Sequence, residues 1–125
     1  MADNKLALVA GEDIGKTALG VFRRGDDFIG KTVSIAGTNA TGEQLAAMFT
    51  AALGEMVVYR PLTTDQMRAS GQPGAVEVAN MFQFYADASD YFTGVRNLDL
   101  VRELNPELQP LDAWLTQHKD EIPLD

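Results

Sequence analysis

Short apolar segments of strand length alternate with amphipathic helical segments in the first half of the chain, and this order constrains the fold most. Residues 5–10, 32–36 and 56–60 have the apolar or alternating pattern of strands. Helices are expected between them, because Asp13 and Thr41 are N-cap residues followed by apolar side chains at helical spacing. Strands joined through helices pair in parallel with right-handed crossovers. We therefore predict an α/β fold with a small three-stranded, mainly parallel sheet.

The second half of the chain is predicted to be helical and to cover this sheet, giving about five packed helices in all. The most secure helix begins at the capping box Thr41–Gln44 and ends at Gly54. We find no repeat and no linker, so residues 1–125 are expected to form a single domain. The expected helical segments are 13–24, 41–54, 63–69, 75–86 and 97–104, with a last amphipathic turn or two at 111–118.

Composition excludes several classes of function. Ten basic and 18 acidic residues give a net charge of −8, which argues against binding to nucleic acid or to an anionic membrane surface. The chain has no cysteine and a single histidine, His118, which excludes disulfides, thiol chemistry and metal sites built from thiolates or several histidines. No apolar segment is long enough to span a bilayer, and no signal peptide is recognisable. We therefore expect a cytoplasmic location by default.

No group of residues predicts catalysis or cofactor binding. The segment Gly15–Thr17 resembles the end of a P-loop, but Ala10 stands where that loop needs glycine, and Glu12 and Asp13 would repel phosphate. The dinucleotide fingerprint Gly-x-Gly-x-x-Gly is absent. His118 fits a helix-end or solvated histidine better than a catalytic base. We therefore expect no enzymatic activity, no cofactor and no metal.

The densest aromatic segment of the chain is the candidate binding surface. Residues 80–85 form part of an expected helix, and Tyr91 follows within one loop. Helical spacing places Phe82 on the face expected to be buried, whereas Phe84 lies on another face. A core role for the stripe and a role in binding are both open, since an apolar second face can line a pocket or contact a partner. The predicted ligand or partner surface comprises Asn80, Met81, Phe84, Tyr85 and Phe92.

The order and spacing of several motifs resemble the C-terminal, substrate-side part of NmrA-like proteins, which are atypical relatives of the short-chain dehydrogenases with a Rossmann fold. The resemblance covers almost the whole chain. In the family, the N-terminal part carries the glycine-rich dinucleotide loop, and this chain lacks it, so NAD(P) binding is not carried over. The motifs are residues 12–15, 30–32, 41–46, 79–85, 104–106 and 111–115.

The resemblance implies a stand-alone NmrA-like C-terminal domain that acts as a small-ligand or protein-interaction module. The surface that meets the Rossmann part in the family would be exposed here, so we expect a homodimer or a separate protein partner. The alternative is the substrate-side portion of a two-part NAD(P)-dependent oxidoreductase or redox sensor that needs a separate Rossmann subunit. A third interpretation is a folded fragment without a selected function.

Overall fold

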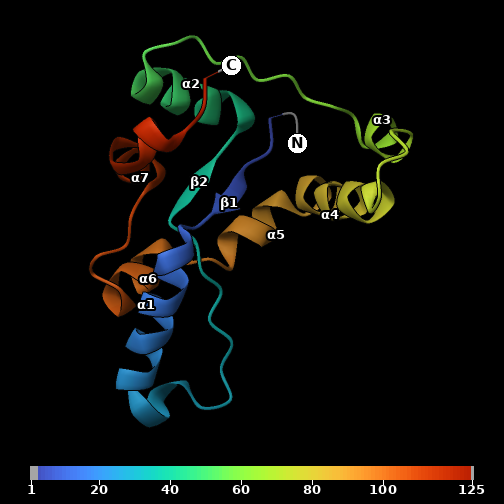
Figure 1. Cartoon of the computed structure of the whole chain (residues 1–125). Helices are drawn as coiled ribbons and strands as arrows, with labels where there is room; N and C mark the ends of the chain where they lie inside the picture. Colours follow the sequence, from blue (N-terminus) through green and yellow to red (C-terminus); the bar gives the residue numbers. More distant parts are fainter. Residues whose placement is uncertain (1–2, 125) are drawn as a thin grey trace.

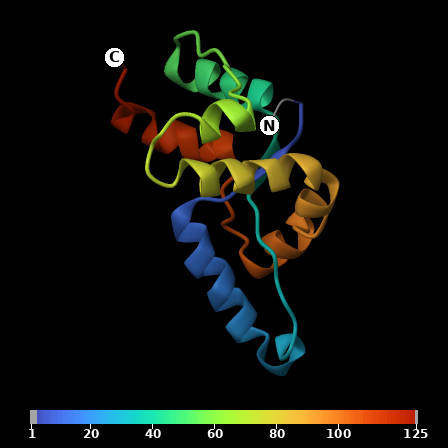
Figure 2. The same ribbon diagram turned by 90° about the vertical axis from the view of Figure 1, so that its right-hand side faces the viewer.

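Helices surround a small antiparallel sheet in the computed structural model, which describes residues 3–124 (Figure 1). Strand β1 (Leu6–Leu8) pairs with β2 (Thr38–Ala40), with Ala7 opposite Asn39. Helices α2 and α7 lie near one end of the sheet, and α1 and α6 lie near the other. Helix α4 crosses in front of the strands in Figure 2. The fold is therefore of the mixed α/β class, as the sequence predicts.

Six of the seven helices correspond to predicted segments, whereas α5 falls where a loop was expected around Tyr91. Helices α2 and α3 begin at capping boxes, Thr41–Gln44 and Thr63–Gln66. Thr41 Oγ1 accepts a hydrogen bond from the Gln44 backbone N–H at 3.2 Å, and Gln44 Oε1 accepts one from the Thr41 N–H at 2.9 Å. The helices are α1 (Gly11–Arg23), α2 (Gly42–Leu53), α3 (Thr64–Arg68), α4 (Ala75–Asp87), α5 (Ser89–Gly94), α6 (Leu98–Leu104) and α7 (Leu111–His118), with 3₁₀ turns η1 (Gly25–Phe28) and η2 (Lys119–Glu121).

The prediction of a three-stranded, mainly parallel sheet is wrong, because residues 3–124 contain two strands and these run antiparallel. Helix α1 points away from the sheet, and the chain returns beside it and enters β2 at the same end of the sheet where it left β1 (Figure 1). The expected strand at 32–36 is unpaired, and pairing falls on β2 instead. An apolar pattern forms a strand only where another backbone supplies hydrogen-bond partners.

The third expected strand, 56–60, is also unpaired. This segment contacts α2 instead, through the Thr50 side chain and through Gly42 in the first turn. The Val57 N–H donates to Thr50 Oγ1 at 2.9 Å, and the Thr50 hydroxyl donates to the Val57 carbonyl at 3.4 Å. The Tyr59 ring lies so close to Gly42 that a Cβ at this position would overlap it. These contacts replace the expected sheet ladder.

Asp13 is not the N-cap that the sequence predicts. The N-cap position of α1 is three residues earlier, at Ala10, and no side chain caps the helix. The Asp13 side chain is fully buried, and its two oxygens accept hydrogen bonds from Asn105 Nδ2 and from the Gln109 backbone N–H, each at 2.9 Å. A buried carboxylate needs such donors. The side chain therefore joins the first helix to the segment between α6 and α7.

Helices α1 and α6 pack at very close range, and Gly20 makes this possible. A Cβ at Gly20 would overlap the backbone carbonyl of Leu104, whereas one at Gly15 of the same helix would meet nothing within 4 Å. Val101 of α6 is fully buried beside this contact. The absence of a side chain at Gly20 therefore sets the distance between the two helices.

Two glycine substitutions in α1 are expected to have opposite effects. Gly20→Ala should lower the free energy of unfolding by about 1–3 kcal/mol, because the new methyl group pushes α6 away. Gly15→Ala should raise it by about 0.5–1 kcal/mol, because alanine is the better helix former at an open position. Urea unfolding of both variants measures the difference. Equal effects of the two substitutions would contradict the close α1–α6 contact.

Candidate functional site

A largely apolar cavity of about 390 Å³ lies among the end of β1, the start of α1, and helices α2 and α7; we call it the α2–α7 cavity. Leu45 and Phe49 face it because they are one turn apart on α2, and Leu111 and Trp114 face it because they are three residues apart on α7. Its volume falls in the range of small-molecule sites. Its walls are formed mainly by Leu8, Val9, Leu45, Phe49, Leu111 and Trp114.

Two polar side chains on the cavity wall, Glu12 and Gln109, are bonded to each other. Gln109 Nε2 donates to Glu12 Oε1 at 3.0 Å. A hydrogen bond from the backbone N–H of Glu12, and next the one from Gln109, lower the pKa of the Glu12 carboxyl below its usual value. Glu12 is therefore an ionised carboxylate at neutral pH. Glu12 is exposed to solvent, so the cavity combines apolar walls with a negative charge at its solvent-facing edge.

Gln109 Oε1 is a buried acceptor that receives no hydrogen bond from residues 3–124. The orientation of the amide is fixed by its neighbour, because turning it would set its oxygen against the Glu12 carboxylate. The Gln109 backbone N–H is bound to Asp13, so the residue is held at both ends. Thr38, the third polar residue of the wall, accepts a hydrogen bond from the Leu111 N–H at 2.8 Å.

Trp114 lines the cavity and stacks on the imidazole of His118, with 4.4 Å between ring centroids and 23° between ring planes. His118 is the last residue of α7, and its Nδ1 lies 3.3 Å from Glu121 Oε2. The prediction of a helix-end histidine is confirmed. Its neighbours are an aromatic ring and an acidic side chain of the adjacent turn.

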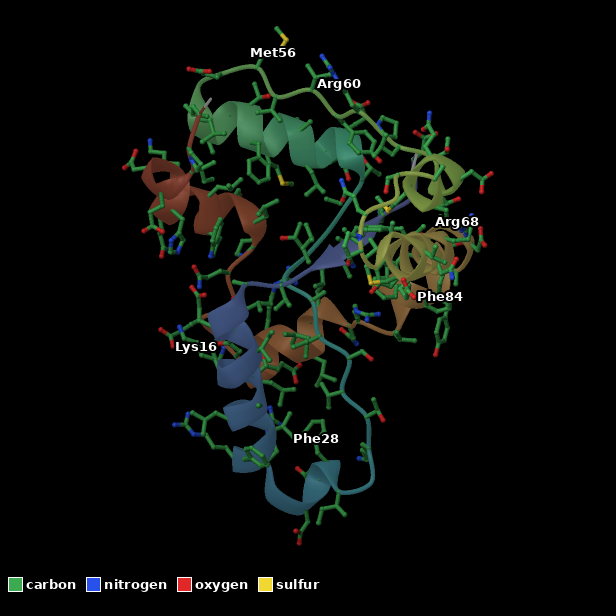
Figure 3. All side chains as sticks on the ribbon, turned by 45° about the vertical axis from the view of Figure 1, so that its right-hand side comes forward. Lys16, Phe28, Met56, Arg60, Arg68 and Phe84 are labelled. Carbon is green, nitrogen blue, oxygen red and sulfur yellow. The ribbon has the colours of Figure 1, made fainter. Side chains whose placement is uncertain are left out.

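The structure divides the five predicted surface residues between two environments. Tyr85 and Phe92 pack against each other, with ring centroids 4.2 Å apart, and Phe92 is buried at 8% exposure. Met81 and Phe84 are exposed at 41% and 51%, and Figure 3 shows Phe84 pointing away from the body of the protein. Asn80 Oδ1 accepts hydrogen bonds from Arg68 Nε and Nη2, at 3.2 and 3.0 Å.

None of these five residues lines the α2–α7 cavity. Sequence reasoning missed the cavity residues Glu12, Gln109 and Trp114 as members of one site, because they come from separate segments. The only signal for them was indirect, since Glu12 and Trp114 belong to two of the motifs that carry the family resemblance.

Within the described range, no three acidic or histidine side chains gather where a metal ion could bind. No helix in that range is long and apolar enough to cross a membrane.

Comparison with known proteins decides the family. The NmrA-like family matches residues 1–118 of the chain. The chain belongs to the NmrA-like family. It is also 32% identical over 121 residues to NmrA-like family domain-containing protein 1 of Rattus norvegicus, covering 96% of this chain and 60% of that protein. The resemblance in the sequence motifs is thereby confirmed, and the chain spans 60% of the length of this NmrA-like relative.

Proposed function

We propose that this NmrA-like chain is a binding module that holds a small, largely apolar ligand in the α2–α7 cavity. The observation that carries the proposal is the combination of apolar walls around about 390 Å³ with the Glu12–Gln109 pair at one place on the wall. Ligand sites commonly pair an apolar lining with a few polar groups that fix orientation. Burial of the ligand's apolar surface supplies the affinity, and the polar pair orients it.

The residues around the cavity favour binding without chemical turnover. Its polar side chains are the Glu12 carboxylate, the Gln109 amide and the Thr38 hydroxyl. The Thr38 hydroxyl oxygen already accepts a hydrogen bond from the Leu111 N–H. Acyl or proton transfer needs a nucleophile or acid within hydrogen-bond reach of a base that a third group orients. The bond that Glu12 makes with Gln109 does not supply such an arrangement. We therefore propose a non-enzymatic role, with the cavity as its centre.

Magnetic resonance tests this role directly. A neutral apolar probe, indole, titrated into ¹⁵N-labelled protein should shift the amide signals of residues 8–12 and 111–114. Leu45→Trp should abolish these shifts, because the larger side chain occupies the cavity. Leu19→Trp is the matched control, since Leu19 is half exposed on α1 outside the cavity, and it should leave the shifts intact.

The binding proposal would be contradicted if indole moved no signals. It would equally be contradicted if the shifts fell on α4 and α5 instead of the cavity lining.

A second proposed role rests on exposed apolar side chains of α4, α5 and the C-cap of α5, which we call the α4–α5 face: Met81, Phe84, Tyr91 and Val95. Apolar side chains gathered on one surface mark contact sites for other proteins. We propose a second copy of the chain as the partner. The alternative partner is a separate Rossmann subunit of a two-part NAD(P)-dependent oxidoreductase or redox sensor, which would use this face too.

Self-association tests the α4–α5 face. Sedimentation equilibrium at micromolar concentration should show a dimer for the unmodified chain and a monomer for Phe84→Ala. Phe84→Ala should leave the unfolding free energy within about 1 kcal/mol, because the ring is half exposed. Phe92→Ala is the core comparison and should lower that free energy by about 3–5 kcal/mol. A stable monomer for the unmodified chain would exclude the dimer.

A further inference from the structure

We infer that the ligand of the α2–α7 cavity is an organic cation: an apolar molecule that carries a protonated amino or amidino group next to Glu12 and Gln109. This inference rests on the proposed binding function and names the class of ligand within it. It follows from what the polar part of the wall offers to a ligand, which is hydrogen-bond acceptors and a negative charge.

The hydrogen-bond acceptor for a ligand is the Glu12 carboxylate. A carboxylate has about four lone-pair sites on its two oxygens. Gln109 Nε2 and the Glu12 backbone N–H each take one of these sites, so acceptor capacity is left for a ligand. A hydrogen bond between a charged donor and a carboxylate is about twice as strong as a neutral one. The carboxylate therefore favours a cationic donor over a hydroxyl group.

Gln109 Oε1 does not add a second acceptor for a ligand, because it is enclosed and has almost no accessible surface, although no described residue donates to it. The Gln109 amide contributes instead through Nε2, whose bond to Oε1 of Glu12 holds that carboxylate in place. Ammonium and amidinium groups carry several donors and no acceptor, and they therefore match the carboxylate oxygens of Glu12.

The basic side chains nearest the Glu12 carboxylate, His118 and Lys16, both lie outside the cavity lining. His118 Nδ1 lies 3.3 Å from Glu121 Oε2. Lys16, one turn further along α1, forms an ion pair with Glu107 at 3.7 Å and is not part of the cavity lining. Figure 3 shows the Lys16 side chain on the outer side of α1. The cavity lining itself contains no basic side chain. With a net charge of −8, the whole chain also attracts cations rather than anions.

An anionic ligand is the opposite possibility, because the start of α1 lies at the cavity and helix N-termini attract negative charge. The first turn of α1 already holds two carboxylates, Glu12 and Asp13. The Asp13 carboxylate is buried, and Glu12, which is exposed to solvent, is one of the residues that line the cavity. An incoming anion would meet the Glu12 charge directly, so the observations favour the cation.

The single tryptophan of the chain makes the test simple. Trp114 is the only tryptophan in the sequence, and it lines the cavity, so its fluorescence reports on cavity binding. Three probes share one phenyl ring and a similar length but differ in charge: 2-phenylethylamine, 2-phenylethanol and 3-phenylpropionate. At neutral pH the amine should bind at least tenfold more tightly than the alcohol, and the propionate should bind most weakly.

Two matched variants locate the effect. Glu12→Gln keeps the shape of the side chain but removes its charge, and it should reduce amine affinity about tenfold while leaving the alcohol unchanged. Glu43→Gln makes the same change in the first turn of α2, where the exposed Glu43 lies outside the cavity lining. It should preserve the advantage of the amine. Unfolding midpoints of both variants show that each is folded.

The outcomes separate this inference from the binding function on which it rests. If the alcohol or the propionate binds as tightly as the amine, the ligand class is wrong but the cavity still binds ligands. If Glu43→Gln weakens the amine as much as Glu12→Gln does, net charge and not Glu12 attracts the cation, and the inference is overturned. If none of the three probes binds, the proposed binding function fails together with it.

Discussion

The buried carboxylate of Asp13 links the two ends of this sequence. Its side chain is fully excluded from water, and its hydrogen bonds to Asn105 and Gln109 each measure 2.9 Å. Burying a charge costs several kcal/mol unless donors replace the lost water. The segment after α6 must therefore lie against the first turn of α1. Further along the same helix, the missing side chain at Gly20 lets the backbone of α6 pack directly against α1.

The same interaction positions the polar part of the α2–α7 cavity. Asp13 holds the main chain of Gln109, and the preceding residue, Glu12, holds its side-chain amide. On the other side, Gly37 makes room for the Gln109 carbonyl, which a Cβ would approach to 2.7 Å. Thr38 then bonds the Leu111 N–H at the start of α7. The segment before α7 is thus fixed between α1 and β2. This placement also positions α7, and with it Trp114, at the cavity.

Local signals predicted the helices well, whereas features that depend on distant partners were predicted poorly. Both capping boxes formed, because their hydrogen bonds join residues three apart. The expected strands at 32–36 and 56–60 did not pair, since pairing requires a second backbone that no local pattern reveals. Asp13 is of a residue type that commonly caps helices, but its carboxylate accepts hydrogen bonds from residues more than ninety positions away.

The candidate site shows the same division. The aromatic stripe of α4 was visible in the sequence, and the structure leaves its Phe84 exposed while burying Phe92. The cavity was not predicted, because each of its stripes alone is indistinguishable from ordinary core packing. The cavity wall forms only when α2 and α7 pack together, because α2 supplies Leu45 and Phe49 and α7 supplies Leu111 and Trp114.

A double-mutant cycle between Asp13 and Asn105 tests the dependence of the fold on this carboxylate most directly. Urea unfolding would be measured for Asp13→Ala, Asn105→Ala and the double variant. Asp13→Ala should lower the unfolding free energy by about 2–4 kcal/mol, because it leaves one buried and one partly buried donor without an acceptor. The coupling between the two substitutions should be about 1–3 kcal/mol. Additivity within about 0.5 kcal/mol would contradict the account.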